Sequence, residues 1–599
     1  MATEAIPATP AWLEIVRGDA PLLLIAPHGG RAGAAARATL HPKVNDLETA
    51  AITRELAERL DATALVNSGM DRNDLDCNRL SQVMEREPWL LETIADEVAR
   101  ITARHGRVTV LLIHGWNIIE PRVDLGLGLK ERNGRLHPTR GAHIAANDDF
   151  IQDTAHALAT RLRQAGIVPT FGLRYPGGAA QNLLQAFTPR HAASEHPAVR
   201  RLANLAATGV INALQLELSV AVRLAGDVRR NMIDAVVATF GPPRGDGASR
   251  SAIAVVRDGT PKPARKSVAS SANLPPFRIG VEFYDPAIGL GGMASFDFGP
   301  NAAGGRIMML FERRRVALFT GEGGAERIGD SVALGPLTLD GGAGSSGLRF
   351  HGPAVVVDDG TAYLSVEGAL AGGRLDPAME VDTTLEFADG APRFCDVLGR
   401  LEAIIAQLAQ ARAGADEVAP IIVPRSSFGR LRGAVSFDGA RHRLDAIARV
   451  GVSFTGLGTR NFAQRRMVWA SLDGAQPHEA LELSALEFDA SPTHRSAALL
   501  ACGAWQQAEL CGLELEAASP YVPPDRIVAS IIDAPRVIAL EGVPDTFMTL
   551  SRPGPDGSRI HTSLGFARYR IDGREGAGMY EYSRRAGTAT TDDTDGSED

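Results

Sequence analysis

Apolar and polar positions alternate in two different ways along this chain of 599 residues. Up to about residue 240, short fully apolar runs alternate with longer segments whose apolar positions recur near every 3.6 residues. The apolar runs predict strands that are covered on both faces, and the periodic segments predict amphipathic helices. This order of strands and helices predicts an α/β domain with a mostly parallel sheet.

The individual elements of this first domain can be placed on the sequence. Its expected strands are the apolar runs at 22–25, 63–67, 108–115 and 212–219. Its expected helices are the periodic segments at 45–60, 90–106 and 150–166. Gly106 and Gly166 stand where the second and third of these helices should stop.

Beyond residue 277 the pattern is that of a β protein. Short β-like segments such as 277–285 and 306–312 are separated by glycine turns, which predicts a sandwich or barrel. Between the two regions lies a stretch rich in Gly, Pro, Ser and Lys, and the chain ends in a polar, acidic run. The predicted division is an α/β domain at 1–240, a linker at 241–276, a first β half at 277–395, a connecting helix at 396–415, a second β half at 416–585 and a disordered tail at 586–599.

Composition narrows the class of protein. The apolar and charged fractions are those of a soluble globular protein, and the net charge of -9 gives no reason to expect nucleic acid as a partner. The four cysteines form no CxxC pair, which argues against a disulfide framework and against a thiolate zinc site. We find no signal-peptide pattern and no apolar run near the ~20 residues of a membrane span. We therefore expect a cytoplasmic protein without a stable membrane anchor.

Histidines follow two of the expected buried strands. His28 comes after the strand at 22–25, and His114 lies near the end of the strand at 108–115. Ligands of open α/β sheets bind outside the carboxyl ends of the strands. Glu217 lies between two leucines of another strand, where a carboxylate is costly to bury unless it is paired or bound.

Two histidines and one carboxylate make a catalytic zinc set whose open fourth position holds water. His28, Asp46 and His114 would be the ligands, and Glu217 would be the base that takes the proton of that water. Glu48 lies on the same expected helical turn as Asp46. The sequence does not decide which of these two carboxylates is the ligand.

A charged segment, "MDRNDLDCNR", follows the expected strand at 63–67 and precedes the expected helix at 90–106. It is either a turn with internal ion pairs or a site for a substrate carboxylate, because the planar fork of arginine binds a carboxylate through two hydrogen bonds. The candidate substrate-binding residues in it are Arg72, Asn78 and Arg79.

The first 240 residues resemble the N-formylglutamate amidohydrolase family through "PHGG", "NDLET", "RNDLDCNR", "LLIHGWN" and "LQLELS", in that order. The resemblance implies a phosphorylase/hydrolase-like α/β fold with a mixed sheet and zinc-dependent hydrolysis of C–N bonds. It implies that Zn²⁺ is bound by His28, Asp46 and His114, with Glu48 as the alternative to Asp46. It further implies that Arg79 holds a substrate carboxylate and that Glu217 is the base.

The region 277–585 resembles tandem lipocalin-like proteins related to carotenoid 1,2-hydratase. The resemblance rests on "RVGVSFTGLGTRNFAQRRMVWASLDG" and on the late "GAGMYEYSR". It implies barrels that can hold one apolar ligand, with Asp445, Arg460 and Glu581 as polar candidates in the pocket.

The leading expectation is a zinc-dependent amidohydrolase that cleaves an amide bond of a small N-acyl amino acid-like substrate bearing a carboxylate. The alternative is a lipocalin-like binding protein, or an isoprenoid hydratase or cyclase, that acts through the β region.

Overall fold

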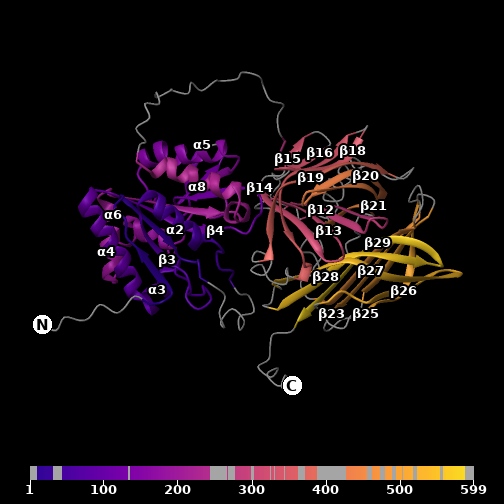
Figure 1. Cartoon of the computed structure of the whole chain (residues 1–599). Coiled ribbons are helices and arrows are strands. Elements are labelled where there is room, and N and C mark those ends of the chain that lie inside the picture. Colours follow the sequence, from indigo (N-terminus) through magenta and orange to yellow (C-terminus); the bar gives the residue numbers. More distant parts are fainter. Residues whose placement is uncertain are drawn as a thin grey trace. The chain divides into compact units, whose positions relative to one another are not determined.

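The structure of the protein is a computed structural model in which the chain forms two compact units, Met1–Arg257 and Asp258–Asp599. Figure 1 colours the first unit from indigo to magenta and the second from pink to yellow. The structure describes residues 10–30, 43–132, 135–242, 266–267, 277–298, 303–323, 326–328, 331–342, 345–361, 372–387, 426–454, 462–472, 479–488, 494–501, 504–516, 522–553 and 558–586.

The first unit is built on a seven-stranded mixed sheet in the order β1-β3-β2-β4-β9-β5-β8. Its strands are β1 (Leu13–Val16), β2 (Leu22–Ala26), β3 (Thr63–Asn67), β4 (Val108–Gly115), β5 (Arg122–Gly126), β8 (Val168–Phe171) and β9 (Ile211–Leu218). The four central strands β3, β2, β4 and β9 are parallel, whereas β1 and β5 run antiparallel to β3 and β9. The predicted α/β class with a mixed sheet is confirmed.

Helices cover both faces of this sheet (Figure 1). Its helices are α2 (Thr49–Leu60), α3 (Leu80–Arg86), α4 (Pro88–His105), α5 (His156–Gln164), α6 (Pro197–Ala207), α7 (Val220–Arg223) and α8 (Asp227–Phe240). Apolar residues of α2, α5 and α8 pack in one core cluster on one face, and those of α3, α4 and α6 pack in a second cluster on the other. A hairpin of β6 (Leu129–Arg132) and β7 (Arg135–Pro138), and the short helices η1 (Phe150–Ala155), η2 (Leu183–Phe187) and η3 (Pro189–His191), complete the unit.

Local sequence explains most of these bounds. All five residues of β2 are buried, as an unbroken apolar run predicts. Pro88 begins α4 and Gly106 ends it in the left-handed conformation, as expected of these two residues at helix ends. The helix predicted to start at residue 45 starts only at Thr49, because Glu48 has a positive φ of 69° and leaves Asp46 in the preceding loop.

The second unit contains two closed antiparallel barrels of eight strands each. In the first barrel, β11 to β14 are followed by β18 to β21, and pairing of β21 with β11 and of β18 with β19 closes the ring. Its strands are β11 (Phe277–Asp285), β12 (Leu290–Phe298), β13 (Ala303–Phe311), β14 (Arg315–Gly323), β18 (Ser345–Val357), β19 (Arg374–Phe387), β20 (Ser427–Phe437) and β21 (Ala440–Phe454). The short strands β10 (Lys266–Ser267), β15 (Glu326–Ile328), β16 (Ser331–Leu334) and β17 (Leu337–Gly342) extend its sheet beside β18.

The second barrel is a simple meander in which each strand pairs with the next and β29 returns to β22. Its strands are β22 (Phe462–Leu472), β23 (Ala480–Phe488), β24 (His494–Ala501), β25 (Ala504–Glu516), β26 (Arg526–Asp533), β27 (Arg536–Pro553), β28 (Arg559–Ile571) and β29 (Arg574–Ala586). The predicted tandem lipocalin-like region is therefore confirmed as two barrels.

The division between the two β parts lies further along the chain than the sequence placed it. β20 and β21 follow the segment 396–415 but belong to the first barrel, so the second barrel begins with β22. The predicted helix at 396–415 lies outside the described residues, as does the acidic tail after Ala586 and most of the predicted linker at 241–276. β10 lies within that linker.

A group of charged residues joins the two barrels. Arg449 of β21 forms ion pairs with Glu282 of β11 at 2.8 Å and with Glu482 of β23 at 2.6 Å. Trp469 of β22 donates its indole N–H to the same Glu282 at 2.6 Å. Because these side chains are mostly buried, each carboxylate depends on Arg449 for its compensating charge.

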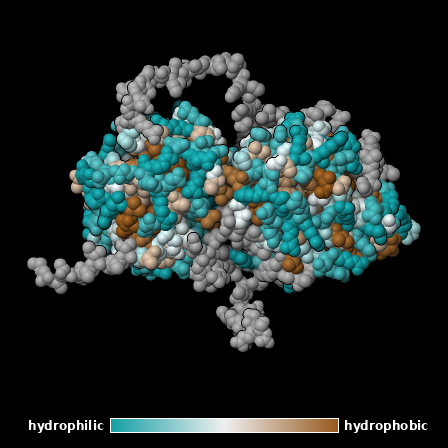
Figure 2. Space-filling view, in the orientation of Figure 1, coloured by the Kyte–Doolittle hydropathy of each residue, from teal (hydrophilic) through white to brown (hydrophobic). Residues whose placement is uncertain are grey.

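The surface is mainly hydrophilic (Figure 2), as the ordinary apolar and charged fractions of the sequence predict. On the face shown in Figure 2, hydrophilic residues cover most of the described surface of each unit, and hydrophobic residues form small separate areas. Among the described residues, no helix combines the length and the apolar character that a membrane crossing requires.

Replacement of Arg449 by methionine tests the inter-barrel ion pairs. We expect Arg449→Met to lower the free energy of unfolding of the second unit by about 2 kcal/mol, because two mostly buried carboxylates lose their partner. Urea denaturation of the full chain, followed by circular dichroism, measures the shift of the midpoint. Arg526→Met is the matched control, because the Arg526–Glu541 pair is about half exposed and should contribute less than ~1 kcal/mol. Equal midpoints for the two variants would contradict this account.

Candidate metal centre

The central parallel strands bring three of the predicted site residues to one edge of the sheet. His28 follows β2, His114 lies near the end of β4, and Glu217 lies near the end of β9. These strands are neighbours in the order β2-β4-β9, and His114 and Glu217 are direct partners in the strand register. The carboxyl edge of the sheet therefore carries both histidines and the buried glutamate.

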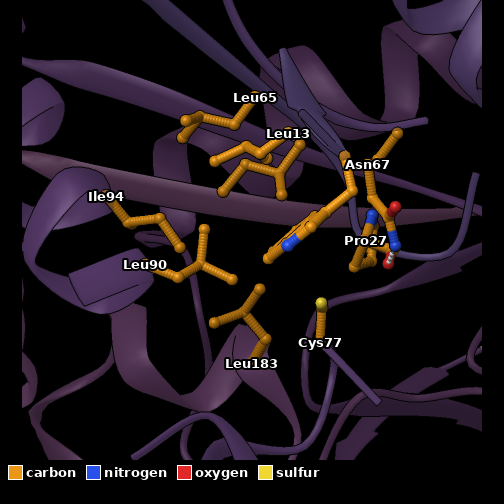
Figure 3. Close-up of a pocket in the computed structure, with 11 residues that line it drawn as sticks. Leu13, Pro27, Leu65, Asn67, Cys77, Leu90, Ile94 and Leu183 are labelled. Atoms are coloured by element: carbon orange, nitrogen blue, oxygen red, sulfur yellow. Dashed lines mark hydrogen bonds between the residues drawn. The ribbon is translucent and has the colours of Figure 1, made fainter. Parts of the chain in front are cut away.

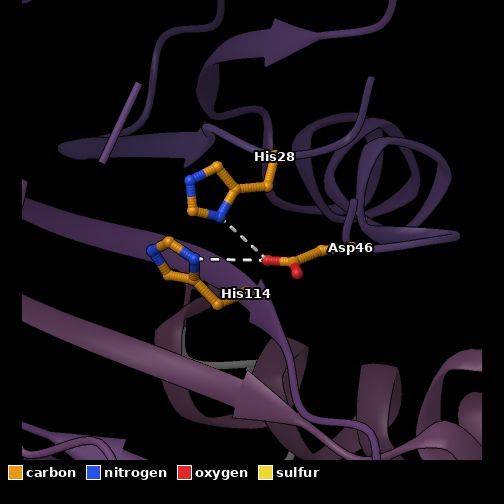
Figure 4. A group of neighbouring side chains, drawn as sticks. All are labelled: His28, Asp46 and His114. Atoms are coloured by element: carbon orange, nitrogen blue, oxygen red, sulfur yellow. Dashed lines mark hydrogen bonds and ion pairs between the residues drawn. The ribbon is translucent and has the colours of Figure 1, made fainter. Parts of the chain in front are cut away.

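Asp46 completes a compact group with the two histidines (Figure 4). One carboxylate oxygen, Oδ2, lies 3.2 Å from Nδ1 of His28 and 3.3 Å from Nδ1 of His114. The candidate ligand atoms of all three residues lie within 4.8 Å of one another. His28, Asp46 and His114 are 1%, 4% and 2% exposed, so this polar group is enclosed by protein.

The loop before α2 explains why Asp46, and not Glu48, faces the histidines. The backbone N–H of Asp46 donates to the carbonyl of His28 at 2.8 Å, and Thr49 Oγ1 donates to the carbonyl of Asp46 at 2.7 Å. Glu48 turns away and accepts a hydrogen bond from Arg229 of α8 at 2.9 Å. The carboxylate that the sequence left undecided is therefore Asp46 in the geometry of the structure.

A second carboxylate orients His28. Nε2 of His28 lies 2.8 Å from Oδ1 of Asp76, whose other oxygen accepts a hydrogen bond from Lys43 Nζ at 2.7 Å. Burial would raise the pKa of Asp76, but the bonds from His28 and Lys43 outweigh it and hold the pKa well below its usual value. Since Asp76 is an ionised acceptor, Nε2 of His28 must carry the proton, and the lone pair of a neutral ring is then on Nδ1.

This arrangement fits a metal cation. A neutral His28 presents the Nδ1 lone pair to an oxygen of Asp46, so two acceptors face each other at 3.2 Å. Either a second proton on His28 or a cation shared by both atoms relieves their repulsion. Tetrahedral zinc with bonds of about 2.0–2.1 Å places neighbouring ligand atoms about 3.3 Å apart, which matches both distances to Asp46.

Burial and charge shift the pKa values in this group. Burial would raise the pKa of Asp46, but its contacts with His114 and His28 hold the pKa well below its usual value. Burial lowers the pKa of His114, which favours the neutral ring that a metal requires. Burial, then the negative charges of Asp46 and Asp124, raise the pKa of Glu217 well above its usual value. A buried carboxyl group with a raised pKa is suited to proton transfer.

The predicted carboxylate-binding residues have three different environments. Arg72 donates to the carbonyl of Val44 at 2.9 Å and lies 3.4 Å from Oδ1 of Asp46, so it supports the candidate ligand. Asn78 accepts the backbone N–H of Leu183 through its side chain at 3.3 Å. Arg79 is exposed at the start of α3.

The segment around Arg72 also builds the framework of the site. The backbone N–H of Arg72 donates to Oδ1 of Asn45 at 3.0 Å, and Nδ2 of Asn45 donates to Asp71 at 3.0 Å. Asn73 exchanges hydrogen bonds with the backbone of Lys43 at 2.6 and 2.8 Å. Neither this network nor the role of Asp76 was predicted from the sequence, although acidic and amide side chains are dense in "MDRNDLDCNR".

Two polar residues beside Glu217 were also missed by the sequence analysis. Gln215 precedes Glu217 by two positions on the same face of β9 and donates to its Oε1 at 2.6 Å. Asp124 of β5 is the strand partner of Glu217 and accepts the backbone N–H groups of Leu173, Arg174 and Tyr175, each at 2.9 Å. Asp124 thereby holds the loop after β8 beside the site. Both residues could have been noticed in the sequence as polar residues within mainly apolar strands.

No family model matches the chain, and no curated protein matches it either. Among solved structures, an N-formylglutamate amidohydrolase from Ralstonia eutropha JMP134 matches with 16% identity, 38% coverage of this chain, 96% coverage of that chain and a TM-score of 0.25. Kievitone hydratase from Nectria haematococca matches with 8% identity, 54% and 93% coverage and a TM-score of 0.29. A protein of Nitrosomonas europaea provisionally assigned to AttH matches with 11% identity, 54% and 98% coverage and a TM-score of 0.31. An amidohydrolase and a hydratase, the two kinds of protein that the sequence resembles, are thus both found.

An apolar pocket lies beside the end of β2 (Figure 3). Its lining includes Pro27, which precedes His28, and Cys77, which follows Asp76. Asn67, the polar amide in the lining, donates to the carbonyl of Pro27 at 2.9 Å. Burial raises the pKa of Cys77 to about 12, so its thiol is protonated at neutral pH. The hydrogen bond from Asn67 holds the chain at Pro27, directly before His28.

The predicted polar residues of the C-terminal pocket are not brought together. Asp445 lies on β21, about half exposed, and pairs with Arg430 and Arg432 at 2.9 and 3.1 Å. Glu581 lies on β29, on the same face as Met579, which packs in the apolar cluster shared by the two barrels. Arg460 lies outside the described residues. Neither described residue faces the interior of its barrel, because each alternates with the inward-facing positions of its strand.

Replacement of the two competing carboxylates tests which one binds metal. We expect Asp46→Asn to lower the affinity for added Zn²⁺ at least ~100-fold, because a buried anionic ligand atom is lost. We expect Glu48→Gln to leave the affinity within about threefold, because Glu48 faces Arg229. Competition against a chromophoric chelator measures both. A larger loss for Glu48→Gln than for Asp46→Asn would reverse the assignment.

Proposed function

We propose that the first unit is a zinc-dependent amidohydrolase that cleaves the amide bond of a small N-acyl amino acid-like substrate bearing a carboxylate. The proposal rests on one observation: the donor atoms of His28, Asp46 and His114 converge at the carboxyl edge of the sheet, where His114 is the strand partner of the buried Glu217. Two histidines and one carboxylate form the ligand set of several catalytic zinc sites, with one position left open.

His28, Asp46 and His114 would hold the metal, and a zinc ion supplies Lewis-acid chemistry that polarises a carbonyl oxygen and lowers the pKa of water. Glu217 takes a proton from the attacking water as the new C–O bond forms. It then delivers that proton to the amine nitrogen as the C–N bond breaks, so its charge is restored. Gln215 holds the Glu217 carboxyl group by its hydrogen bond at 2.6 Å.

The proposed substrate carboxylate is bound by Arg79. Arg72 and Asn78 were candidates for the same task, but both side chains contact other parts of the framework. Arg79 is exposed and lies three residues after Asp76, which orients His28. A planar guanidinium binds a carboxylate through two hydrogen bonds, which suits substrates that keep a free carboxylate beside the amide.

Metal content and turnover test the function directly. We expect about one zinc per chain in the wild type by elemental analysis, and hydrolysis of members of a panel of N-acyl amino acids. Glu217→Gln should keep its zinc and lose about 10²–10⁴-fold in kcat, because it removes the proton acceptor and leaves the ligands intact.

His114→Ala is the companion variant and should lose both zinc and activity. A wild type that takes up no zinc would overturn the proposal and would favour a second proton on His28 as the link to Asp46. Full activity in Glu217→Gln would remove Glu217 from the mechanism and leave the metal site standing.

Asp76→Asn tests the support of His28. An asparagine can present either its oxygen or its NH₂ group to Nε2, so it no longer fixes the lone pair on Nδ1. We expect the zinc dissociation constant to rise about 10–100-fold. Asp74→Asn, in the same segment, is the control. It should change the zinc dissociation constant less than about twofold, since the carboxylate that contacts His28 is that of Asp76. Equal dissociation constants for the two variants would show that Asp76 has no part in metal binding.

A further inference from the structure

Arg223 is a buried arginine next to the candidate metal centre. It ends α7, six residues after Glu217, and is only 2% exposed. Arginine keeps its charge in proteins, and a buried charge is costly unless it is well compensated. Within the described part of the chain, no ion pair joins Arg223 to a carboxylate, so a salt bridge does not account for its position.

The guanidinium of Arg223 connects the two segments that carry Asp46 and His114. Nη1 donates to the carbonyl of Leu47 at 2.9 Å, and Leu47 directly follows Asp46. Nη2 donates to the carbonyl of Trp116 at 3.3 Å and to Oδ1 of Asn117 at 2.9 Å. Both acceptors lie just beyond His114. One rigid group is therefore hydrogen-bonded both to the segment that follows Asp46 and to the segment that follows His114.

Gly115 leaves the space that this group occupies. A Cβ atom on Gly115 would lie 2.7 Å from Nη1 of Arg223, 2.8 Å from its Cζ and 3.1 Å from Cβ of Asp46. Gly115 is part of β4 and does not have a positive φ, so its backbone conformation is open to any residue. A side chain at the position after His114 would therefore displace the guanidinium of Arg223, whereas the backbone geometry alone would admit one.

We infer that Arg223 is a positioning residue that fixes Asp46 relative to His114 and so pre-forms the metal centre. This inference rests on the proposed function for the identity of the bound group. Three acceptors on two segments match the planar, multi-donor head of arginine, whereas the compact ammonium of lysine cannot reach all three at once. All three acceptors belong to the chain itself, so the bridge that Arg223 makes does not use the metal.

Arg223→Lys tests this role because it keeps the charge and removes the bridge. We expect the zinc dissociation constant to rise at least ~10-fold, the size of effect seen when groups behind metal ligands are replaced. With Co²⁺ as the probe, we expect the visible absorption bands of the site to shift and weaken, because they report the geometry of the ligands. Both measurements use the full chain, and the metal-free melting temperature is recorded beside them.

Arg230→Lys is the control: the same substitution seven residues further on, at an exposed side chain of α8 that pairs with Asp227. It should leave the zinc dissociation constant within about twofold and the Co²⁺ bands unchanged.

Gly115→Ala approaches the same contact from the opposite side, and we expect at least a ~5-fold rise in the zinc dissociation constant. If Arg223→Lys does not fold, Gly115→Ala decides the question.

Wild-type affinity and an unchanged Co²⁺ spectrum in Arg223→Lys or, where that variant does not fold, in Gly115→Ala would overturn the inference. A wild type without any affinity for Zn²⁺ or Co²⁺ would instead overturn the proposed function. The two failures are therefore distinguishable in one set of titrations.

Discussion

The carboxylate of Asp46 is buried between two imidazole rings, and much of the first unit is arranged to make that burial possible. One oxygen faces Nδ1 of His28 and Nδ1 of His114, and the other lies near Arg72. An uncompensated charge at this depth would not be stable. Its loop is therefore bonded to the carbonyl of His28 on one side and, through Leu47, to Arg223 on the other.

The sheet supplies the second constraint. Parallel strands β2, β4 and β9 end at the same edge, so residues far apart in sequence meet there without long side chains. Antiparallel β5 then brings Asp124 beside Glu217, where it holds the loop after β8. Because β5 is antiparallel to β9, the structural carboxylate of Asp124 lies next to the proposed catalytic carboxylate of Glu217. The two carboxylates have different hydrogen-bond partners. Asp124 is satisfied by backbone N–H groups, whereas Glu217 has one amide partner and a raised pKa.

The second unit uses its buried charges differently. Arg449 and its two glutamates join neighbouring barrels, and an apolar cluster with residues from both barrels lies between them. Asp445 and Glu581, which the sequence grouped in one pocket, lie on separate barrels and on outward faces. Among the described residues, the candidate metal centre lies in the first unit.

The sequence by itself determined the classes of structure and the two histidines of the candidate metal centre. The mainly apolar runs of β3 and β4 gave strands with the predicted bounds, because burial on both faces of a sheet favours apolar residues. His28 and His114 could be found because a polar residue at the end of such a run is conspicuous. Only the tertiary structure decided between Asp46 and Glu48, since both lie within one turn in sequence and the positive φ of Glu48 turns them apart.

Dependence on spatial contacts also explains why the roles of Asp76 and Arg223 were not predicted from the sequence. Asp76 and Arg223 act through contacts to His28 and to the segments beside Asp46 and His114, and no spacing along the chain encodes such contacts. Likewise, the barrel boundary depends on which strand closes each ring, and β21 returns to β11 across more than 150 residues. Local patterns specify elements and their polar positions, whereas ring closure and side-chain partners are set by which elements meet in space.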